Sequence, residues 1–337
     1  MSSLPLLPLP EKPKLVGIAR LASEGESLRE GHNVEYFTIQ TKSLLNRCVS
    51  KRQMPFTWTI NPYRGCEFAC KYCYARYTHE FMEMRDGIDF EQKIYVKQHA
   101  ADLLRQELRR VKPDEAIALG TATDPYQPAE RKYEVTRAIL EEFARHRGYE
   151  LGIVTKSNLI LRDLDLLREV ARTNYLSVHV TITTLNVELA RILEPRAPRP
   201  DLRMDAVRAL SAAGIRVGVS SSPVVPGITD SPQDLESLVR SAAEAGADHL
   251  FANPLFLKPC SAAVFLPFLE QNFPHLIENY RQRYAGRAFL PPAYGKRLAQ
   301  LITHFKQKYG IIRNRREPTA YATKWPAQGS AEQLDLF

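Results

Sequence analysis

Residues 151–183 read LGIVTKSNLILRDLDLLREVARTNYLSVHVTIT, and this stretch contains the repeating unit from which we expect the fold to be built. The runs 151–155 and 176–183 are rich in apolar and β-branched residues, which is typical of buried strands. Between them, residues 161–171 mix apolar and charged positions in the pattern of an amphipathic helix. A strand, a helix and a second strand in this order predict a parallel sheet covered by helices.

The same unit recurs on both sides of this stretch. Further strands are expected at 57–60, 116–120, 217–221 and 249–253, with helices at 100–110, 129–146, 201–213, 232–245, 263–284 and 294–309. Six strands, each followed by a helix, predict an α/β fold, a partial (β/α)6 barrel of the TIM type. We divide the chain into an N-terminal extension packing on the barrel (1–50), the barrel (51–285), a C-terminal helical extension (286–325) and a flexible tail (326–337).

Composition and charge narrow the classes of function. Of the 337 residues 44% are hydrophobic, which is enough for a sizeable core. Four prolines interrupt the apolar N-terminal stretch, and no run of about 18 apolar residues follows, so we expect a cytoplasmic protein without a membrane partner. The net charge of +8 fits a polyanionic partner such as nucleic acid, although an excess of Lys and Arg also serves solubility.

Three of the five cysteines lie within eight residues, at Cys66, Cys70 and Cys73 in the sequence NPYRGCEFACKYCYAR. An odd, sparse set does not suit a disulfide framework, and clustered thiols in a reducing compartment indicate metal or redox chemistry. Thiolates bind iron–sulfur clusters or zinc. A structural zinc site needs four ligands, and the nearest further candidate is His79. We favour a [4Fe-4S] cluster, because three ligands leave one iron open to a substrate or cofactor.

The spacing C-x3-C-x2-C, with Tyr72 just before the last cysteine, resembles the motif of the radical S-adenosylmethionine (SAM) superfamily. The resemblance extends from about residue 36 to residue 284. The segments FTWTINPYRGC, TATDPYQPAE, TTLNVELARILEPRAPRPDLR and VVPGITD look like the bacterial proteins grouped with spore photoproduct lyase, an enzyme that splits a thymine dimer in DNA.

This resemblance implies two cofactors, a [4Fe-4S] cluster on Cys66, Cys70 and Cys73 and S-adenosyl-L-methionine. In the superfamily, the amino and carboxylate groups of SAM chelate the open iron, and one electron from the reduced cluster breaks the C5′–S bond. The resulting 5′-deoxyadenosyl radical abstracts a hydrogen atom from the substrate. A cellular one-electron reductant is therefore an expected partner, while the protein orients the reactants and excludes competing reactions.

The resemblance further implies that polar side chains at the C-terminal ends of the strands bind SAM. By their place in the family's fold, the expected cofactor contacts are Tyr72, Thr121, Thr123, Asp124, Lys156, Ser157, Thr183 and Arg196. The guanidinium of Arg196 suits the carboxylate of SAM, and the alternative is an ion pair with Glu194 or a nearby acid. For Tyr72 we favour packing around the cluster over a role as a radical relay.

One feature departs from spore photoproduct lyase, which uses an additional cysteine as hydrogen-atom donor. This sequence has none in the corresponding loop, and its uncommitted thiols are Cys48 and Cys260. Our candidate catalytic residues are Cys260, which is otherwise a small buried hydrophobe, and Tyr74, which is a radical relay or packs around the cluster. The departure puts activity as that particular lyase in doubt.

The last five residues are Gln333, Leu334, Asp335, Leu336 and Phe337, and they follow a polar linker that contains glycine. The peptide resembles those by which bacterial polymerases and repair proteins dock on the sliding clamp. Three apolar anchors on a tether suit insertion into a preformed groove. The alternative is a tail that folds back on its own barrel.

These observations predict a radical SAM enzyme, similar to a lyase, that acts on nucleic acid in DNA repair or processing. Its expected partners are DNA, the bacterial sliding clamp and the reductant. Two alternatives stay open: the same chemistry on RNA, a peptide or a small molecule, and a non-catalytic nucleic-acid-binding module with structural zinc.

Overall fold

A sheet of seven strands organises the computed structural model, which describes residues 15–31, 34–49 and 54–311. The strand order is β11-β10-β9-β8-β7-β4-β3. The strands are β3 (Leu45–Arg47), β4 (Trp58–Ile60), β7 (Ala116–Leu119), β8 (Glu150–Thr155), β9 (Tyr175–Thr181), β10 (Val217–Val224) and β11 (His249–Pro254). Neighbours from β4 to β11 are parallel, and β3 runs antiparallel to β4. The six strands expected from the sequence are therefore confirmed.

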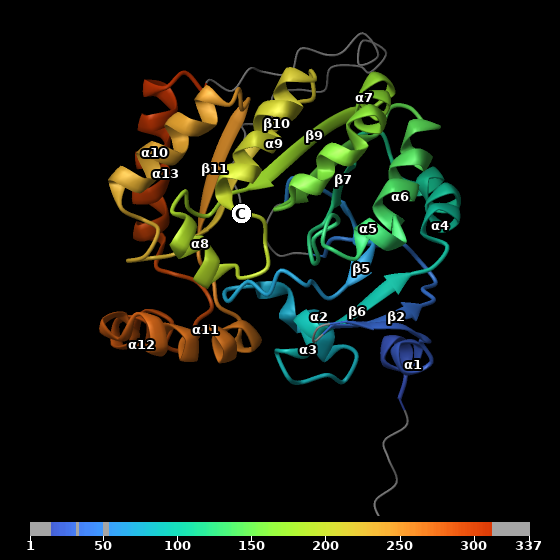
Figure 1. Cartoon of the computed structure of the whole chain (residues 1–337), viewed down its shortest axis with the longest axis horizontal. Coiled ribbons are helices and arrows are strands. Elements are labelled where there is room, and N and C mark those ends of the chain that lie inside the picture. Colours follow the sequence, from blue (N-terminus) through green and yellow to red (C-terminus); the bar gives the residue numbers. More distant parts are fainter. Residues whose placement is uncertain (1–14, 32–33, 50–53, 312–337) are drawn as a thin grey trace, which may run out of the picture.

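Helices pack against this sheet, as Figure 1 shows. They are α4 (Ala100–Glu107), α5 (Glu130–Tyr133), α6 (Val135–Ala144), α7 (Leu164–Thr173), α8 (Val187–Leu193), α9 (Pro200–Ala212), α10 (Pro232–Glu244) and α13 (Pro292–Lys308). Ile153, Val178 and Val180 are fully buried in the core between the layers. This arrangement confirms the predicted α/β fold with a partial (β/α)6 barrel.

Two of the expected helices are interrupted, and each break has a local cause. The helix expected at 129–146 is split at Glu134, whose φ of 49° is left-handed. The helix expected at 263–284 is divided into α11 (Pro259–Asn272) and α12 (Ile277–Arg283). Pro274 lies between them, and proline cannot donate the backbone hydrogen bond that would continue the first helix.

A second sheet, which was not expected from the sequence, has the strand order β1-β2-β6-β5. Its strands are β1 (Ser27–Gly31), β2 (Val34–Ile39), β5 (Tyr63–Arg64) and β6 (Lys93–Lys97). Only β2 and β6 are parallel. The short helices α1 (Gly17–Ser23), α2 (Tyr77–Glu80) and α3 (Asp89–Gln92) lie with this sheet, below the large sheet in Figure 1.

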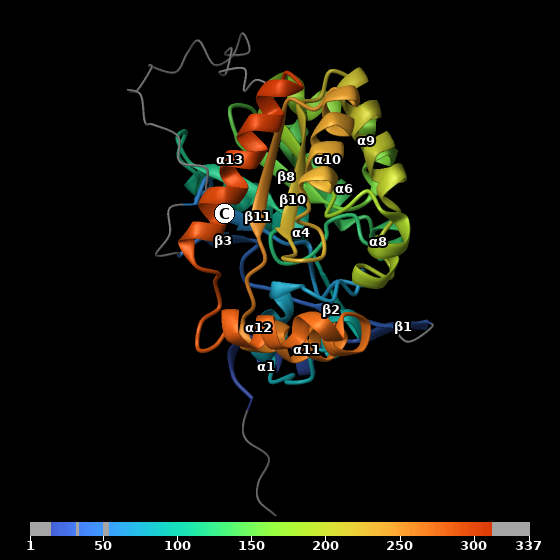
Figure 2. The same cartoon turned by 90° about the vertical axis from the view of Figure 1, so that its left-hand side faces the viewer.

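The cysteine segment connects the two sheets, because it follows β5 of the small sheet and approaches loops of the large one. The described strands of the large sheet do not close into a ring, and β3 and β11 are its two edges. Figure 2 shows α13 beside β11, with α11 and α12 below that strand. Among the described helices, none is long and apolar enough to cross a membrane.

Candidate active site

The loop that carries the three cysteines starts at Gly65, where the backbone has a φ of 84°. A Cβ at this position would lie 2.7 Å from the carbonyl oxygen of Lys93 and 2.9 Å from that of Phe90, so only glycine fits. The backbone N–H of Cys66 donates to the same Phe90 carbonyl at 2.9 Å. The small sheet and α3 therefore fix where the cysteine loop begins.

The three thiols lie close together on this loop. Cys70 is buried, and Cys66 and Cys73 are half-buried. Burial raises the pKa of the Cys66 thiol well above its ordinary value, and the nearby negative charges of Asp124, Cys70 and Cys73 raise it further. Burial also raises the pKa of Cys70 to about 12. A buried group of thiols is the donor set that an iron–sulfur cluster requires.

His79, the sequence's nearest candidate for a fourth zinc ligand, is turned toward the small sheet. Its Nε2 lies 3.0 Å from the carbonyl oxygen of Lys93, and its ring packs against Phe90 and Tyr95. In the described parts of the chain, no three His, Cys, Asp or Glu side chains are arranged to hold a single metal ion. With His79 turned toward the small sheet, the loop offers three thiols, which suits a cluster on three thiolates rather than a zinc site with four protein ligands.

Glu67, which follows the first cysteine, pins the loop between the two sheets. Its Oε1 accepts a hydrogen bond from the backbone N–H of Ala129 at 2.8 Å, and its Oε2 accepts one from the Tyr36 hydroxyl at 2.7 Å. The backbone N–H of Glu67 donates to the side chain of Gln127, which in turn donates to the carbonyl of Gly65. Neither residue was predicted from the sequence. For Glu67, a charged residue between the clustered cysteines was the available signal.

Tyr72 belongs to a buried polar network beside the cysteines. Its hydroxyl donates to Glu194, as does the Thr183 hydroxyl at 2.9 Å. Arg203 forms an ion pair with Glu194 at 2.5 Å. The Lys156 Nζ lies 5.7 Å from the centre of the Tyr72 ring. Burial raises the pKa of Glu194, but the charges of Arg203 and Lys156 outweigh this effect and lower the pKa below its ordinary value.

The carboxylate of Asp124 joins the loops after β7 and β8. Its Oδ1 accepts from the Thr155 hydroxyl at 2.7 Å, and its Oδ2 accepts from the backbone N–H of Lys156 at 2.7 Å. The neighbouring Thr123 donates its hydroxyl hydrogen to the carbonyl of Gly65 at 2.6 Å. Both side chains therefore link loops around the cysteine segment.

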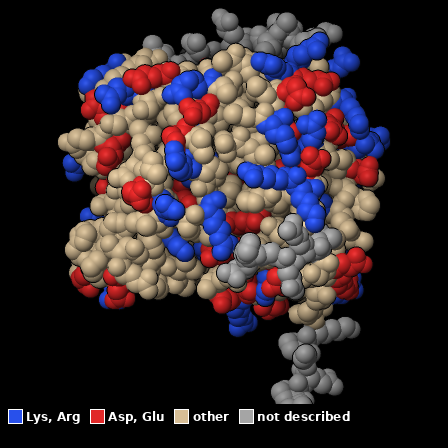
Figure 3. Space-filling model, in the orientation of Figure 1, with Lys and Arg blue, Asp and Glu red and all other residues tan. Residues whose placement is uncertain are grey.

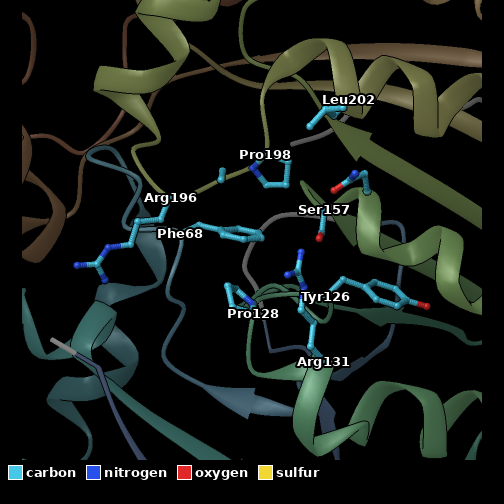
Figure 4. A pocket seen from close by; sticks show the side chains of 10 residues that line it. Phe68, Tyr126, Pro128, Arg131, Ser157, Arg196, Pro198 and Leu202 are labelled. Atoms are coloured by element: carbon cyan, nitrogen blue, oxygen red, sulfur yellow. The ribbon is translucent and has the colours of Figure 1, made fainter. Parts of the chain in front are cut away.

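Ser157 and Arg196 border a pocket of about 320 Å³ that is also lined by Phe68 of the cysteine loop, as Figure 4 shows. The Ser157 hydroxyl accepts from the backbone N–H of Leu159, while Arg196 is exposed and points away from the other labelled side chains. Its guanidinium reaches the carbonyl of Glu91 at 3.5 Å. Of the alternatives for Arg196, an ion pair with Glu194 is not formed, because Glu194 pairs with Arg203. A nearby acid is present, since burial raises the pKa of Glu67 and the charge of Arg196 acts against this rise.

The other predicted residues lie on the side of the cysteine loop that faces α11. The Tyr74 hydroxyl donates to the backbone carbonyl of Thr121, so these two predicted residues are in contact. Burial raises the pKa of Tyr77, and the nearby negative charges of the uncommitted thiols Cys48 and Cys260 raise it further. Two thiols that are 212 positions apart in the sequence thus lie near one tyrosine.

The sequence of this chain is similar to those of known proteins. The model of the family described as the radical SAM superfamily matches residues 60–241. An uncharacterized protein of Mycobacterium tuberculosis is 36% identical over 300 residues, covering 88% of each chain. An uncharacterized protein of Methanocaldococcus jannaschii is 29% identical over 233 residues, covering 69% of this chain and 83% of its own.

Two solved structures share the fold. Spore photoproduct lyase complexed with dinucleoside spore photoproduct aligns with a TM-score of 0.62 and 16% identity, over 81% of this chain and 79% of that one. Streptococcus suis SuiB bound to S-adenosylmethionine aligns with a TM-score of 0.50 and 15% identity, over 81% of this chain and 53% of that one. At such identities these similarities concern the fold alone.

Proposed function

Because the chain belongs to the radical SAM superfamily, we propose that it is an enzyme that cleaves S-adenosyl-L-methionine reductively at a [4Fe-4S] cluster. Cys66, Cys70 and Cys73 would hold the cluster. The observation that carries the proposal is the group of three thiols on one loop, below the parallel strands and pinned to both sheets. Thiols stay reduced in the cytoplasm, which is where we place this chemistry.

When bound, the cluster and SAM supply a 5′-deoxyadenosyl radical that can take a hydrogen atom from a substrate. The protein's part is to position the reactants and exclude water. Lys156, Tyr72 and Thr183 surround Glu194 and would border the cofactor on one side. Asp124 already holds the loops after β7 and β8, so we assign it the role of positioning Lys156. We propose Thr121, Thr123, Ser157 and Arg196 as further cofactor contacts.

Nucleic acid is the substrate class that we propose. The net charge of +8 supports it, as does the fold shared with spore photoproduct lyase, which was solved with a dinucleoside photoproduct. On the face shown in Figure 3, basic and acidic side chains are interspersed. The charge distribution alone therefore does not indicate a single path along which a phosphate backbone would bind on that face.

Tyr74 and Cys260 remain our candidates for catalytic roles. The rings of Tyr74 and Tyr77 are 6.5 Å apart, and Cys260 lies near Tyr77 at the start of α11. Spore photoproduct lyase has a donor cysteine in a loop where this chain has none. The proximity of Cys260 to the cysteine loop supports a role for Cys260 as the hydrogen-atom donor instead.

Anaerobic reconstitution with iron and sulfide, followed by reduction, tests the central proposal. We expect the wild type to bind the cluster and to convert SAM to 5′-deoxyadenosine. Cys70→Ala should lose both cluster absorbance and cleavage, whereas Cys48→Ala, outside the loop, should retain the iron. Uptake of zinc alone, or an assembled cluster that never cleaves SAM with or without nucleic acid, would contradict the proposal.

We propose further that the residues 333–337, QLDLF, dock on the bacterial sliding clamp. They lie outside the described residues, so the support comes from the sequence alone. Deleting them should abolish binding to the purified clamp in a surface-binding assay. A tail with the same five residues in scrambled order is the matched control and should also fail, while binding by either variant would refute the proposal.

A further inference from the structure

Five aromatic side chains form a continuous row between the cysteine loop and the segment after β11. In order they are Phe289, Phe256, Tyr74, Tyr77 and Phe81. The centres of neighbouring rings are 5.3, 5.1, 6.5 and 5.8 Å apart. We call these five residues the aromatic row. It passes directly beside the cluster ligands, because Tyr74 follows Cys73 in the chain.

The aromatic row crosses the open side of the barrel. Phe256 comes after β11, one edge of the large sheet, and Cys48 comes after β3, the other edge. The ring centres of Tyr74 and Phe256 are 5.1 Å apart, so the row joins the cysteine loop to the segment after β11. Figure 2 shows the chain passing from β11 down to α11 on this side of the molecule.

Both ends of the aromatic row are exposed to solvent. The side chains of Phe81 and Phe289 are 60% and 41% exposed, and Val49, next to Cys48, is 95% exposed. Large apolar side chains that are exposed together commonly mark a binding surface. Their position at the open side, next to the cysteine loop, points to the substrate of the reaction rather than to a distant partner.

One cation accompanies the row. Lys258 places its Nζ 3.6 Å from the centre of the Tyr77 ring, which is a cation–π contact. Within the described chain, Lys258 is not within 4 Å of a carboxylate oxygen. Positive charge without an acidic partner is available for an anionic ligand.

We propose that the aromatic row binds unpaired bases of a single-stranded nucleic acid, while Lys258 meets a phosphate of its backbone. Aromatic faces that stack bases, next to cations that follow the backbone, are how proteins bind single strands without sequence preference. Bases inside a duplex stack on each other and cannot reach such a row unless they are extruded. This inference rests on the proposed function and names the form of its substrate.

Fluorescence anisotropy of the anaerobic, reconstituted full-length protein with a labelled 12-mer of thymidine or uridine tests the inference. We expect Phe81→Ala and Phe289→Ala each to weaken binding by about fivefold or more. Lys258→Ala should weaken it and lower the slope of log affinity against log salt by about 0.7, the value for one phosphate contact to a single strand. A blunt duplex should bind more weakly than either single strand.

Lys308→Ala is the matched control. Lys308, the last residue of α13, also lies over an aromatic ring, 5.4 Å from the centre of Tyr309. Unlike Lys258, it forms an ion pair, with Glu236 of α10. Its loss should leave the affinity for the 12-mers unchanged. Iron content and thermal unfolding show whether each variant is folded and carries its cluster. Because Phe81 and Phe289 are exposed, we expect their replacement to leave both properties unchanged.

Several outcomes would overturn the inference: unchanged affinity in the Phe81 and Phe289 variants, a duplex bound as tightly as the single strands, or an acidic peptide bound in their place. The proposed function fails on different grounds, because SAM cleavage is assayed separately, both with and without nucleic acid. Cleavage without single-strand binding would refute this inference alone, and binding without cleavage would refute the enzymatic proposal alone.

Discussion

Replacing Arg203 by methionine should destabilise the protein strongly, because Arg203 is the main counter-charge of a buried carboxylate. Its guanidinium pairs with Glu194 at 2.5 Å and donates to the carbonyl oxygens of Pro198 and Thr181 at 2.6 and 3.2 Å. The side chains of Arg203 and Glu194 are each 1% exposed. Methionine has a similar length and helix propensity, so the substitution removes the charge and the hydrogen bonds while α9 is kept.

The magnitude follows from burial. Removing one partner of a buried ion pair leaves the other charge buried and unpaired, which costs about 3–5 kcal/mol. Lys156 still acts on Glu194, but the two carbonyls also lose their donor. We therefore expect the free energy of unfolding to fall by about 3–5 kcal/mol. Urea unfolding of the reconstituted protein under anaerobic conditions, followed by circular dichroism, measures it.

Arg199→Met provides the control, since the pair of Arg199 with Asp201 is 64% and 45% exposed and lies at the start of the same helix. That variant should unfold like the wild type. Adding Glu194→Gln to Arg203→Met should recover part of the loss, because the buried charge is then gone. A loss below about 1 kcal/mol for Arg203→Met, which is the range of exposed pairs, would refute the reasoning.

Three further predictions concern the loop, the histidines and Asp124. Gly65→Ala should lower the bound iron per chain, because its Cβ would meet two backbone carbonyls; full iron content would contradict the geometry. Burial lowers the pKa values of His79 and His179 to about 4. The free energy of unfolding should therefore be highest above pH 6.5 and should fall between pH 6.5 and pH 4, by about 1.4 kcal/mol per pH unit for each histidine. The urea midpoint of His79→Gln should fall less steeply with pH than that of the wild type. Asp124→Asn should lower the rate of SAM cleavage more than the iron content, which separate assays of 5′-deoxyadenosine and iron would test.

The large sheet could be predicted because its central strands are short apolar and β-branched runs, with buried residues such as Ile153, Val178 and Val219, between helical patterns. The small sheet could not, because β5 has two residues and pairs with β6 about thirty positions later. In β2, the buried positions do not alternate regularly with the others. Short strands whose partners are distant leave little periodic signal in the sequence.

The three clustered cysteines were visible in the sequence because their spacing is itself a motif, but the network around them was not. The LEPR segment suggested Arg196 as a contact for the carboxylate of SAM or as an ion-pair partner of Glu194, and in the structure the partner of Glu194 is Arg203. A signal was present: Arg203 falls on the same stripe of α9 as the buried Val207 and Leu210, at spacings of four and three. A charged residue on an apolar stripe requires a buried partner, and here the partner is Glu194.

The small sheet matters for function because it holds the cysteine loop from the side opposite the barrel. Tyr36 of β2 binds Glu67, and Tyr63 of β5 binds the fully buried Glu130 of α5. The residues matched by the family begin at 60, so Tyr36 lies outside that match and yet contacts the residue next to the first cysteine. The geometry of the three thiols therefore depends on contacts from both sheets, including a strand that the family motif does not contain.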